Sequence, residues 1–87
     1  MSLNFPNQSR SYDATRRAVR FWGHDSAMEW SFFVTDEALT RMQPATVSGE
    51  AAMLGIFDAN RETIYAAAAK RFARERRGSY ELGTADF

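Results

Sequence analysis

The stretch VRFWGHDSAMEWSFFV, residues 19–34, decides the fold of this chain, because it reads as a β-hairpin. Large apolar residues alternate with other residues on both sides of the cluster Gly-His-Asp-Ser at residues 23–26. Alternation with a period of two on both sides of a turn-forming cluster is typical of two paired strands. We therefore expect a hairpin with one apolar face and a core built against that face.

The length of the hairpin loop sets which residues pair across the two strands. A two-residue loop at residues 25–26 pairs Phe21 with Trp30. A four-residue loop at residues 23–26 pairs Phe21 with Met28 instead. Both registers keep the large apolar residues on one face, whereas a three-residue loop mixes the faces unless a bulge restores the register. We therefore reject the three-residue loop and leave the other two open.

Trp22 and Phe33 fall on the opposite face of this hairpin, beside Arg20 and Glu29. That face is therefore not fully polar, and either the N-terminal arm or a protein partner would cover the two rings. The alternative is that they are singly exposed aromatic residues, which are common on protein surfaces. We keep both rings as candidates for an interface.

A short helix and a long helix are predicted after the hairpin. Thr35 caps the short helix, which carries two acids in its first turn and ends at about Gln43, before Pro44. Residues 48–77 contain no proline and read as one helix capped by Ser48. That helix would be about 45 Å long, which exceeds the roughly 30 Å diameter of a domain of this size. It therefore bends, projects into water, or is covered in part by a second copy of the chain.

The long helix carries a broad apolar stripe and a separate row of small residues. The stripe suits the inner face of the hairpin, and we expect Asn60 in its middle to bond a loop carbonyl. The small residues recur at seven-residue spacing: Ala52, Ala59, Ala66 and Ala73. Such a row lets a second helix approach closely, although alanine is also the best helix former on an exposed face. We expect this row to mediate a homodimer.

Shorter elements complete the predicted sheet. Residues 11–13 and 79–82 read as strands, and Gly78 is placed to stop the long helix. Leu3 and Phe5 would anchor an N-terminal arm over the sheet. The whole chain is thus predicted to be a single α+β domain of two layers. One layer is an antiparallel sheet of three or four strands built on the hairpin, and the other is one short and one long helix.

Composition bounds the function. The chain has 87 residues, of which 45% are hydrophobic, and this suffices for one hydrophobic core without disulfides or a structural metal. It has no cysteine, which excludes disulfides, thiolate nucleophiles and Cys-based zinc sites. Its first residues lack an apolar stretch of signal-peptide length, and no segment approaches the roughly 20 apolar residues of a membrane span. We expect a cytoplasmic protein that does not enter a membrane.

The net charge is zero but unevenly distributed. Residues 1–23 carry +3, residues 24–62 carry −5, and residues 63–87 carry +2. The basic end of the long helix is a candidate for binding phosphate groups. Its cations are Lys70, Arg71, Arg74, Arg76 and Arg77. The alternative is a solubilising helix end that complements the helix dipole, and the zero total disfavours strong nonspecific binding of nucleic acid.

No residue set reaches the specificity of a catalytic, cofactor or metal motif. His24, Asp25 and Ser26 are adjacent in a turn and cannot form the hydrogen-bonded chain of a hydrolase triad. Asp58 and Glu62 have the best spacing for a hard cation, but such a pair is also an ordinary solvated face. The helix start at Ser48-Gly49 offers backbone amides to an anion, as every helix start does.

Several segments along the chain carry a family resemblance. They are LNFP at the start, Tyr12-Asp13, Val19-x-Phe21, the passage from Val34 to Leu39, the passage from Phe57 to Ile64, and the ending from Gly78 to Phe87. In these the chain resembles a small bacterial family of domains of unknown function, number 1488. The match covers nearly the whole length and is one of layout. It implies a two-layer α+β fold with an antiparallel sheet, and it supplies no activity, cofactor or functional residues.

The sequence therefore predicts a non-enzymatic, cytoplasmic interaction or accessory protein that self-associates and uses no cofactor. The alternative is weak nucleic-acid binding through the basic end of the long helix. A third hypothesis is an enzyme working through Asp58, Glu62 and Tyr65, whose helical positions suggest that they face water.

Overall fold

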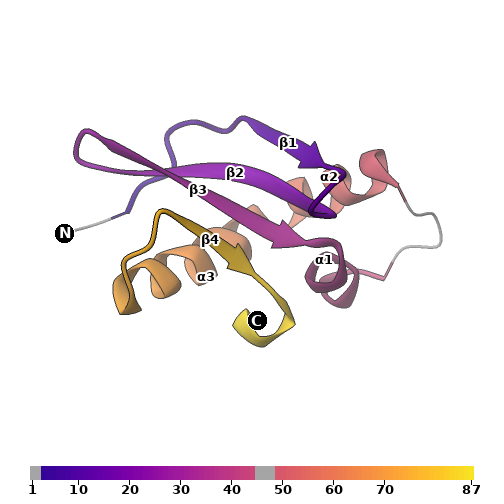
Figure 1. The fold of residues 1–87 in the computed structure, drawn as a ribbon. Coiled ribbons are helices and arrows are strands. Elements are labelled where there is room, and N and C mark those ends of the chain that lie inside the picture. The colour runs from indigo at the N-terminus through magenta and orange to yellow at the C-terminus, as the bar shows by residue number, and fades with distance from the viewer. Residues whose placement is uncertain (1–2, 45–48) are drawn as a thin grey trace.

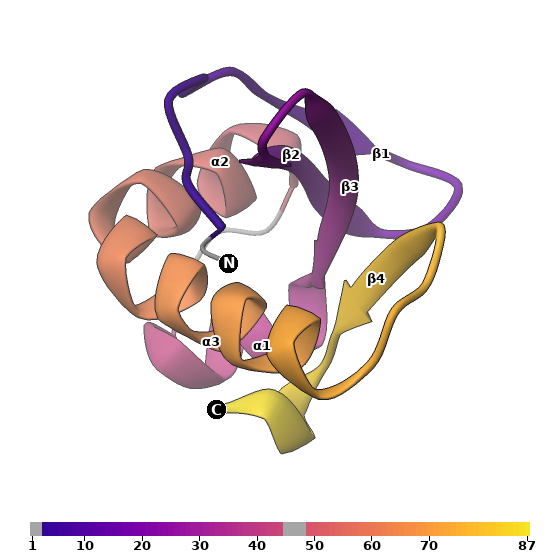
Figure 2. The ribbon, with the colours of Figure 1, turned by 90° about the vertical axis from the view of Figure 1, so that its left-hand side faces the viewer.

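The computed structural model describes residues 3–44 and 49–87. A four-stranded sheet forms one layer, and three α-helices lie together on one side of it (Figure 1, Figure 2). In chain order the elements are β1 (Arg10–Asp13), β2 (Ala18–Asp25), β3 (Met28–Thr35), α1 (Asp36–Met42), α2 (Glu50–Ala59), α3 (Arg61–Arg74), β4 (Ser79–Leu82) and the 3₁₀ turn η1 (Thr84–Asp86). The predicted α+β class is confirmed.

The sheet has the order β1-β2-β3-β4 and is mixed. β1, β2 and β3 are antiparallel neighbours, whereas β4 runs parallel to β3. The sequence predicted an antiparallel sheet, and the last strand departs from that prediction. The reason lies in the connection, because parallel neighbours need a long crossover and three helices separate β3 from β4.

The hairpin of β2 and β3 closes with the two-residue loop Ser26–Ala27. Phe21 therefore pairs with Phe32, which is neither of the two predicted registers. Ser26 has a φ of 58°, so the turn is centred one residue later than a loop at residues 25–26. The observed register differs from both predicted registers by an even number of residues, so the same side chains share a face in all three. The predicted division of apolar residues between the two faces is therefore confirmed.

The core lies between the inner face of the sheet and the helices. The strands contribute the buried side chains of Val19, Phe21, Phe32, Val34, Tyr80 and Leu82. The helices contribute Ala38, Leu39, Met53, Ile56, Phe57, Ile64, Ala67, Ala68 and Phe72. β4 is part of this core although it is short, because its aromatic ring stacks on the ring of Phe32 with centroids 4.9 Å apart.

The short helix α1 forms as predicted. The Thr35 hydroxyl accepts a hydrogen bond from the Ala38 amide at 3.2 Å, which satisfies one of the open donors at the helix start. The helix ends at Met42, Gln43 is its C-cap, and Pro44 follows. Ala38 lies on its buried side, so the helix is fixed by its cap and by the core together.

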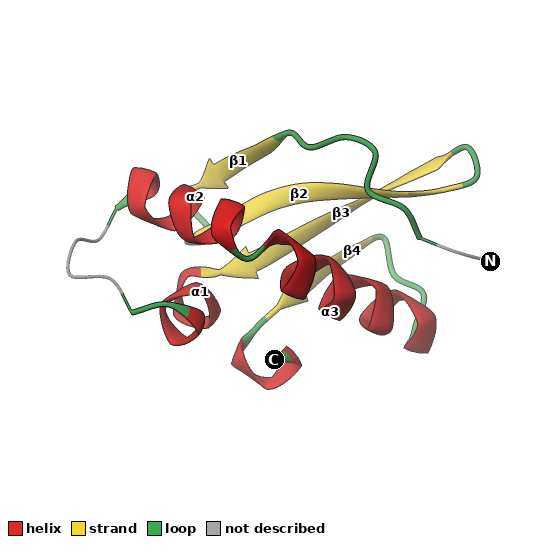
Figure 3. Ribbon diagram, turned by 180° about the vertical axis from the view of Figure 1, so that it is seen from behind, coloured by secondary structure: helices red, strands yellow, loops and turns green. Residues whose placement is uncertain are grey.

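The predicted long helix is two helices, α2 and α3, which follow one another with a bend at Asn60 (Figure 3). The Asn60 main-chain amide donates to the Phe57 carbonyl at 3.1 Å, and its side-chain Nδ2 donates to the Ile56 carbonyl at 2.8 Å. A side-chain amide that takes the place of a main-chain donor competes with helix continuation. The prediction of one uninterrupted helix is therefore wrong, although a bend was one of its three alternatives. The predicted cap, Ser48, lies outside the described residues.

α3 also ends earlier than predicted. Its last residue is Arg74 and Glu75 is the cap, so Gly78 does not stop it. The loop that follows is fixed by Tyr80, whose hydroxyl donates to the Glu75 carbonyl at 2.8 Å and accepts from the Arg77 amide at 3.0 Å.

Within the described ranges, no helix is both long and apolar enough to span a membrane.

The N-terminal arm is anchored by Leu3 and Phe5, as predicted. Asn4 pairs with His24 of β2 through two main-chain hydrogen bonds of 2.8 and 2.7 Å. The Phe5 ring stacks on the ring of Tyr65 in α3, with centroids 4.1 Å apart. The arm therefore lies on the helical side of the sheet and contributes to the core.

Gly23 of β2 has no side chain, and the N-terminal arm packs in the space that a side chain would occupy. An added Cβ would lie 3.0 Å from side-chain atoms of Leu3, Phe5 and Phe32. We expect Gly23→Ala to lower the free energy of unfolding by about 1–3 kcal/mol, because three packed side chains have to shift. Urea denaturation measures the change.

The matched control is Gly55→Ala in α2, where nothing lies within 4 Å of the added Cβ. Gly55 is exposed and helical, so this change should raise the free energy of unfolding by about 0.4–1 kcal/mol. A Gly23→Ala protein as stable as the original chain would show that the arm does not pack as described.

Candidate functional site

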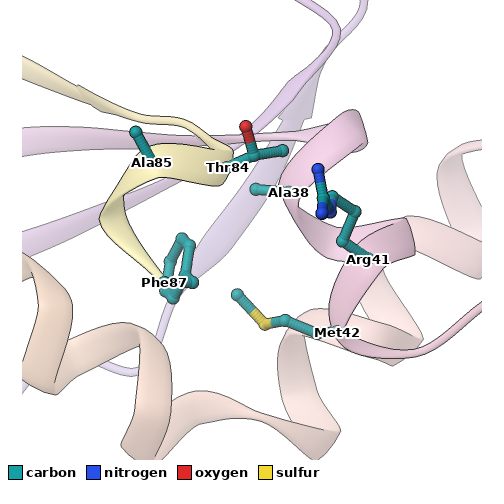
Figure 4. A pocket seen from close by; sticks show the side chains of 6 residues that line it. All are labelled: Ala38, Arg41, Met42, Thr84, Ala85 and Phe87. Carbon is teal, nitrogen blue, oxygen red and sulfur yellow. The ribbon is translucent and has the colours of Figure 1, made fainter.

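Three neighbouring hollows surround the turn η1 at the C-terminal end of the described chain. The largest has a volume of about 460 Å³ and lies between α1 and η1. Its lining side chains are Ala38, Arg41, Met42, Thr84, Ala85 and Phe87. Figure 4 shows Met42 from α1 reaching toward the ring of Phe87, whereas Arg41 extends on the side of Ala38 and Thr84. The first hollow thus combines apolar side chains with the hydroxyl of Thr84 and the guanidinium of Arg41.

The other two hollows lie between η1 and α3. One, of about 320 Å³, is lined by Thr63, Ala66, Ala67, Lys70, Asp86 and Phe87. The other, of about 120 Å³, is lined by Ala67, Lys70, Arg71, Arg74, Ala85 and Asp86. Phe87 is shared by the two larger hollows and is 44% exposed. We call the set Arg41, Met42, Ala66, Lys70, Arg74 and Phe87 the C-terminal surface.

Three cations of the C-terminal surface have no acidic partner in the described part of the chain. They are Arg41 in α1 and Lys70 and Arg74 in α3, and all three are exposed. The acid that lines the two smaller hollows, Asp86, is already bonded to Arg71 at 3.0 Å and to the Gly83 amide at 2.9 Å. The surface therefore keeps a net positive charge around an exposed aromatic ring.

The five cations predicted as phosphate contacts do not form one surface. Arg71 bonds Glu75 at 2.9 Å as well as Asp86, and so ties α3 to η1. Its hydrogen bond lowers the pKa of Glu75, and a second one from Arg77 acts in the same direction. Arg76 lies over the Phe72 ring. Only Lys70 and Arg74 remain without a carboxylate among the residues described here.

The row of alanines is divided between two helices. Ala52 and Ala59 belong to α2, whereas Ala66 and Ala73 belong to α3. Ala52 is half-buried and the other three are exposed. The row exists on each helix separately, but Asn60 interrupts the continuous seam that the sequence predicted. Ala66 alone lines one of the hollows beside Phe87.

The two aromatic rings on the outer face of the sheet are covered from within the chain. Phe33 is 5% exposed, with the Arg16 guanidinium 4.2 Å from its ring centre and that of Arg20 at 5.6 Å. Arg20 also lies 5.1 Å from the half-buried ring of Trp22. From the sequence we expect the N-terminal arm or a partner to cover these rings, or the rings to be singly exposed. The arm lies on the other face, and the arginines of β2 and the preceding turn take its place.

The two members of the predicted acidic pair have different surroundings. Asp58 accepts two hydrogen bonds from Arg10, at 3.0 and 2.8 Å, and one from Arg61 at 2.8 Å. Arg61 also donates to the Tyr65 hydroxyl at 2.7 Å, whereas Glu62 is exposed and outside this cluster. These contacts connect the start of β1 to α2 and α3 beside a hollow of about 390 Å³.

The remaining candidates lie in three separate places. His24 lies 3.2 Å from Glu29 across the hairpin, and no group of three or more metal-ligating side chains is found among the described residues. Asn60 bonds its own helix carbonyl and the Gln43 side chain at 3.3 Å, not a loop carbonyl. Of the predicted anion seat, Gly49 caps α2 with a φ of 115°, and Ser48 is outside the described ranges.

Comparisons with known proteins agree with this fold. The sequence model of a family described as "Protein of unknown function (DUF1488)" matches residues 3–82, and the resemblance predicted from the sequence is confirmed. A crystal structure at 1.60 Å resolution of a DUF1488-family protein of unknown function from Shewanella loihica PV-4 has a TM-score of 0.81 to this chain. It is 18% identical over 93% of this chain and 91% of that one, which shows the fold alone. No curated protein matches the sequence.

The hydrogen bond from Arg10, and to a smaller extent that from Arg61, lowers the pKa of Asp58 below its ordinary value. This carboxylate therefore stabilises the fold above the unfolded-state pKa of about 3.9, and the stabilisation is lost as the pH falls through the lower folded-state pKa. We expect Asp58→Asn to cost about 0.5–1 kcal/mol at pH 7, because the pair is partly exposed, and less near pH 3. Urea midpoints at the two pH values measure this.

Glu62→Gln serves as the control, since this exposed acid has no ion pair in the described chain. It should change the urea midpoint little at either pH. An Asp58→Asn penalty that stays constant between the two pH values would show that the charge of Asp58 does not stabilise the fold.

Proposed function

The chain belongs to the DUF1488 family, and we propose that it is a non-enzymatic module that binds another protein through its C-terminal surface. One observation carries this proposal: Phe87 is 44% exposed between two hollows, and apolar side chains line part of each. An aromatic ring beside a concave apolar surface is the usual anchor of a protein interface.

The contrast with Met28 supports this choice of surface. Among the described residues, Met28 and Phe87 are the large hydrophobic side chains that are exposed, Met28 at 58%. Met28 lies beside the two-residue loop of the hairpin and lines none of the hollows described above. Single exposed hydrophobic residues of that kind are normal on a surface. Phe87 differs because Met42 and Ala66 extend the apolar contact on both sides of it.

The environment of Asp58 supports a non-enzymatic role. Two guanidinium groups already occupy its oxygens, and a carboxylate with a lowered pKa is a weak general base. Its partners Arg10 and Arg61 connect elements far apart in sequence. Their contacts are those of a structural ion-pair cluster.

Nucleic acid is the second candidate ligand. It is favoured by the smallest hollow, which Lys70, Arg71 and Arg74 line together. It is disfavoured by the zero net charge, and by the engagement of Arg76 and Arg77 with the chain itself. An interaction with another protein therefore explains more of this surface, because it also uses the ring of Phe87.

Photo-cross-linking tests the proposal directly. p-Benzoylphenylalanine in place of Phe87 should give one discrete protein adduct when the full chain is expressed in its own cells and irradiated. The same amino acid in place of Met28 is the matched control, and it should give no discrete adduct. A discrete adduct from position 28 but none from position 87 would contradict the proposed surface.

Self-association remains a proposal about the identity of that partner. Ala59, Ala66 and Ala73 are exposed on the helical layer and would contact a second copy. In that case the adduct has twice the mass of the chain, and sedimentation velocity at micromolar concentrations shows a dimer that Ala66→Glu dissociates. A strictly monomeric chain would leave a different protein as the partner.

A further inference from the structure

We infer that the C-terminal surface binds an acidic amphipathic segment of another protein. In this arrangement apolar side chains of the segment fill the hollows beside Phe87, and its carboxylates meet Arg41, Lys70 and Arg74. The inference rests on the proposed function and adds the chemistry of the partner to it.

The charges of the surface point to an acidic partner. Several other arginines of the chain pair with its own acids, as in the ion pairs of Arg10 with Asp58 and of Arg71 with Asp86. Arg41, Lys70 and Arg74 have no such acid in the described chain. They come from two helices, and they rim three hollows that share side chains around η1. A partner with carboxylates at matching positions would supply the missing countercharges.

The shape of the surface points to an amphipathic partner. Met42 and Phe87 line a hollow of about 460 Å³, which is within the roughly 300–1,000 Å³ of typical ligand pockets. Ala66 and Ala67 line the second hollow on the other side of Phe87. Two adjacent hollows suit two apolar side chains on one face of a helix, three or four residues apart. The cations at the rims then face the acids next to them.

A second copy of this chain is the weaker occupant of the same surface. A symmetric dimer that buries the C-terminal surface against itself would bring together two sets of Arg41, Lys70 and Arg74, and like charges disfavour that contact. A head-to-tail contact avoids the repulsion but leaves one surface open on every copy, so it grows into open chains. An acidic segment of a different protein meets neither difficulty.

The distribution of cations also favours an acidic protein over nucleic acid. Three unpaired cations around an exposed aromatic ring match a short segment that carries a few carboxylates. A polyanion is instead bound by a long basic track, and this chain has no net positive charge to attract one. The same cations would serve either ligand, so the experiment includes both.

Titration of the ¹⁵N-labelled full chain, followed by amide chemical shifts, tests the inference. The first probe is a 14-residue peptide with leucine at i, i+3, i+4 and i+7 and glutamate at most other positions. The second replaces each glutamate by glutamine, the third shuffles the first to destroy its spacing, and the fourth is a 20-residue thymidine oligonucleotide. We expect the glutamate peptide to shift the amides of the C-terminal surface and to bind about tenfold more tightly than the other two peptides.

Matched charge reversals locate the effect. Lys70→Glu should weaken binding of the glutamate peptide about threefold, and Lys70→Glu with Arg74→Glu about tenfold, since exposed pairs contribute up to about 1 kcal/mol each. Arg17→Glu, in the turn between β1 and β2, makes the same change of charge as Lys70→Glu and should change the dissociation constant less than twofold. Unfolding curves of each variant confirm that the fold is retained.

Three outcomes would overturn the inference. If the glutamine peptide binds the same residues as tightly, the partner is apolar without being acidic, and the proposed function stands. If no peptide shifts these amides at millimolar concentration while position 87 still cross-links to protein, the acidic segment is wrong and the surface is right. If the oligonucleotide shifts these amides at lower concentration than the glutamate peptide, the surface binds nucleic acid, and both proposals fail.

Discussion

The stacked rings of Phe21 and Phe32, with centroids 5.4 Å apart, hold the parts of this fold together. Phe5 of the N-terminal arm contacts both rings, Phe57 of α2 contacts Phe21, and Tyr80 of β4 stacks on Phe32. The arm, a helix and the last strand thus depend on one pair of side chains at the centre of the hairpin. Residues so distant in sequence meet there only when the two strands pair in one register, so that register also positions the surface around η1.

The sequence predicts features that depend on the alternation of side chains along a strand and on local capping chemistry. It predicts fewer of the features that depend on tertiary contacts. The faces of the hairpin follow from alternation alone, and the cap at Thr35 follows from its hydroxyl and the two acids after it. The register required the conformation of Ser26, which alternation does not report. The break at Asn60 is invisible to a helical wheel, because the apolar stripe continues across it. Its signal was chemical: an asparagine amide able to bond the Ile56 carbonyl in place of a main-chain donor.

The candidate surface was predicted only in part, for a similar reason. Lys70, Arg74 and Ala66 were identified from composition and spacing, but they were assigned to two unrelated functions. Arg41 was missed, since nothing local indicates that the end of α1 lies beside η1 and near α3. The parallel return of β4 brings these elements together, and it depends on a crossover whose direction the residues do not specify. The zero net charge also gave no sign of a basic surface, because it counts every cation equally, whether or not the folded chain pairs that cation with an acid.

The arginines of this protein have two separate uses. Some hold the fold: Arg10 ties β1 to α2, Arg71 ties α3 to η1, and Arg16 covers Phe33 on the outer face of the sheet. Each of these removes a carboxylate or an aromatic ring from the surface available to other molecules. In the described chain, the cations that remain exposed and unpaired are those that the fold does not use in its own contacts. Those around Phe87 form one contiguous area. Stability and binding consequently depend on different cations, and changing the second group leaves the ties of the first in place.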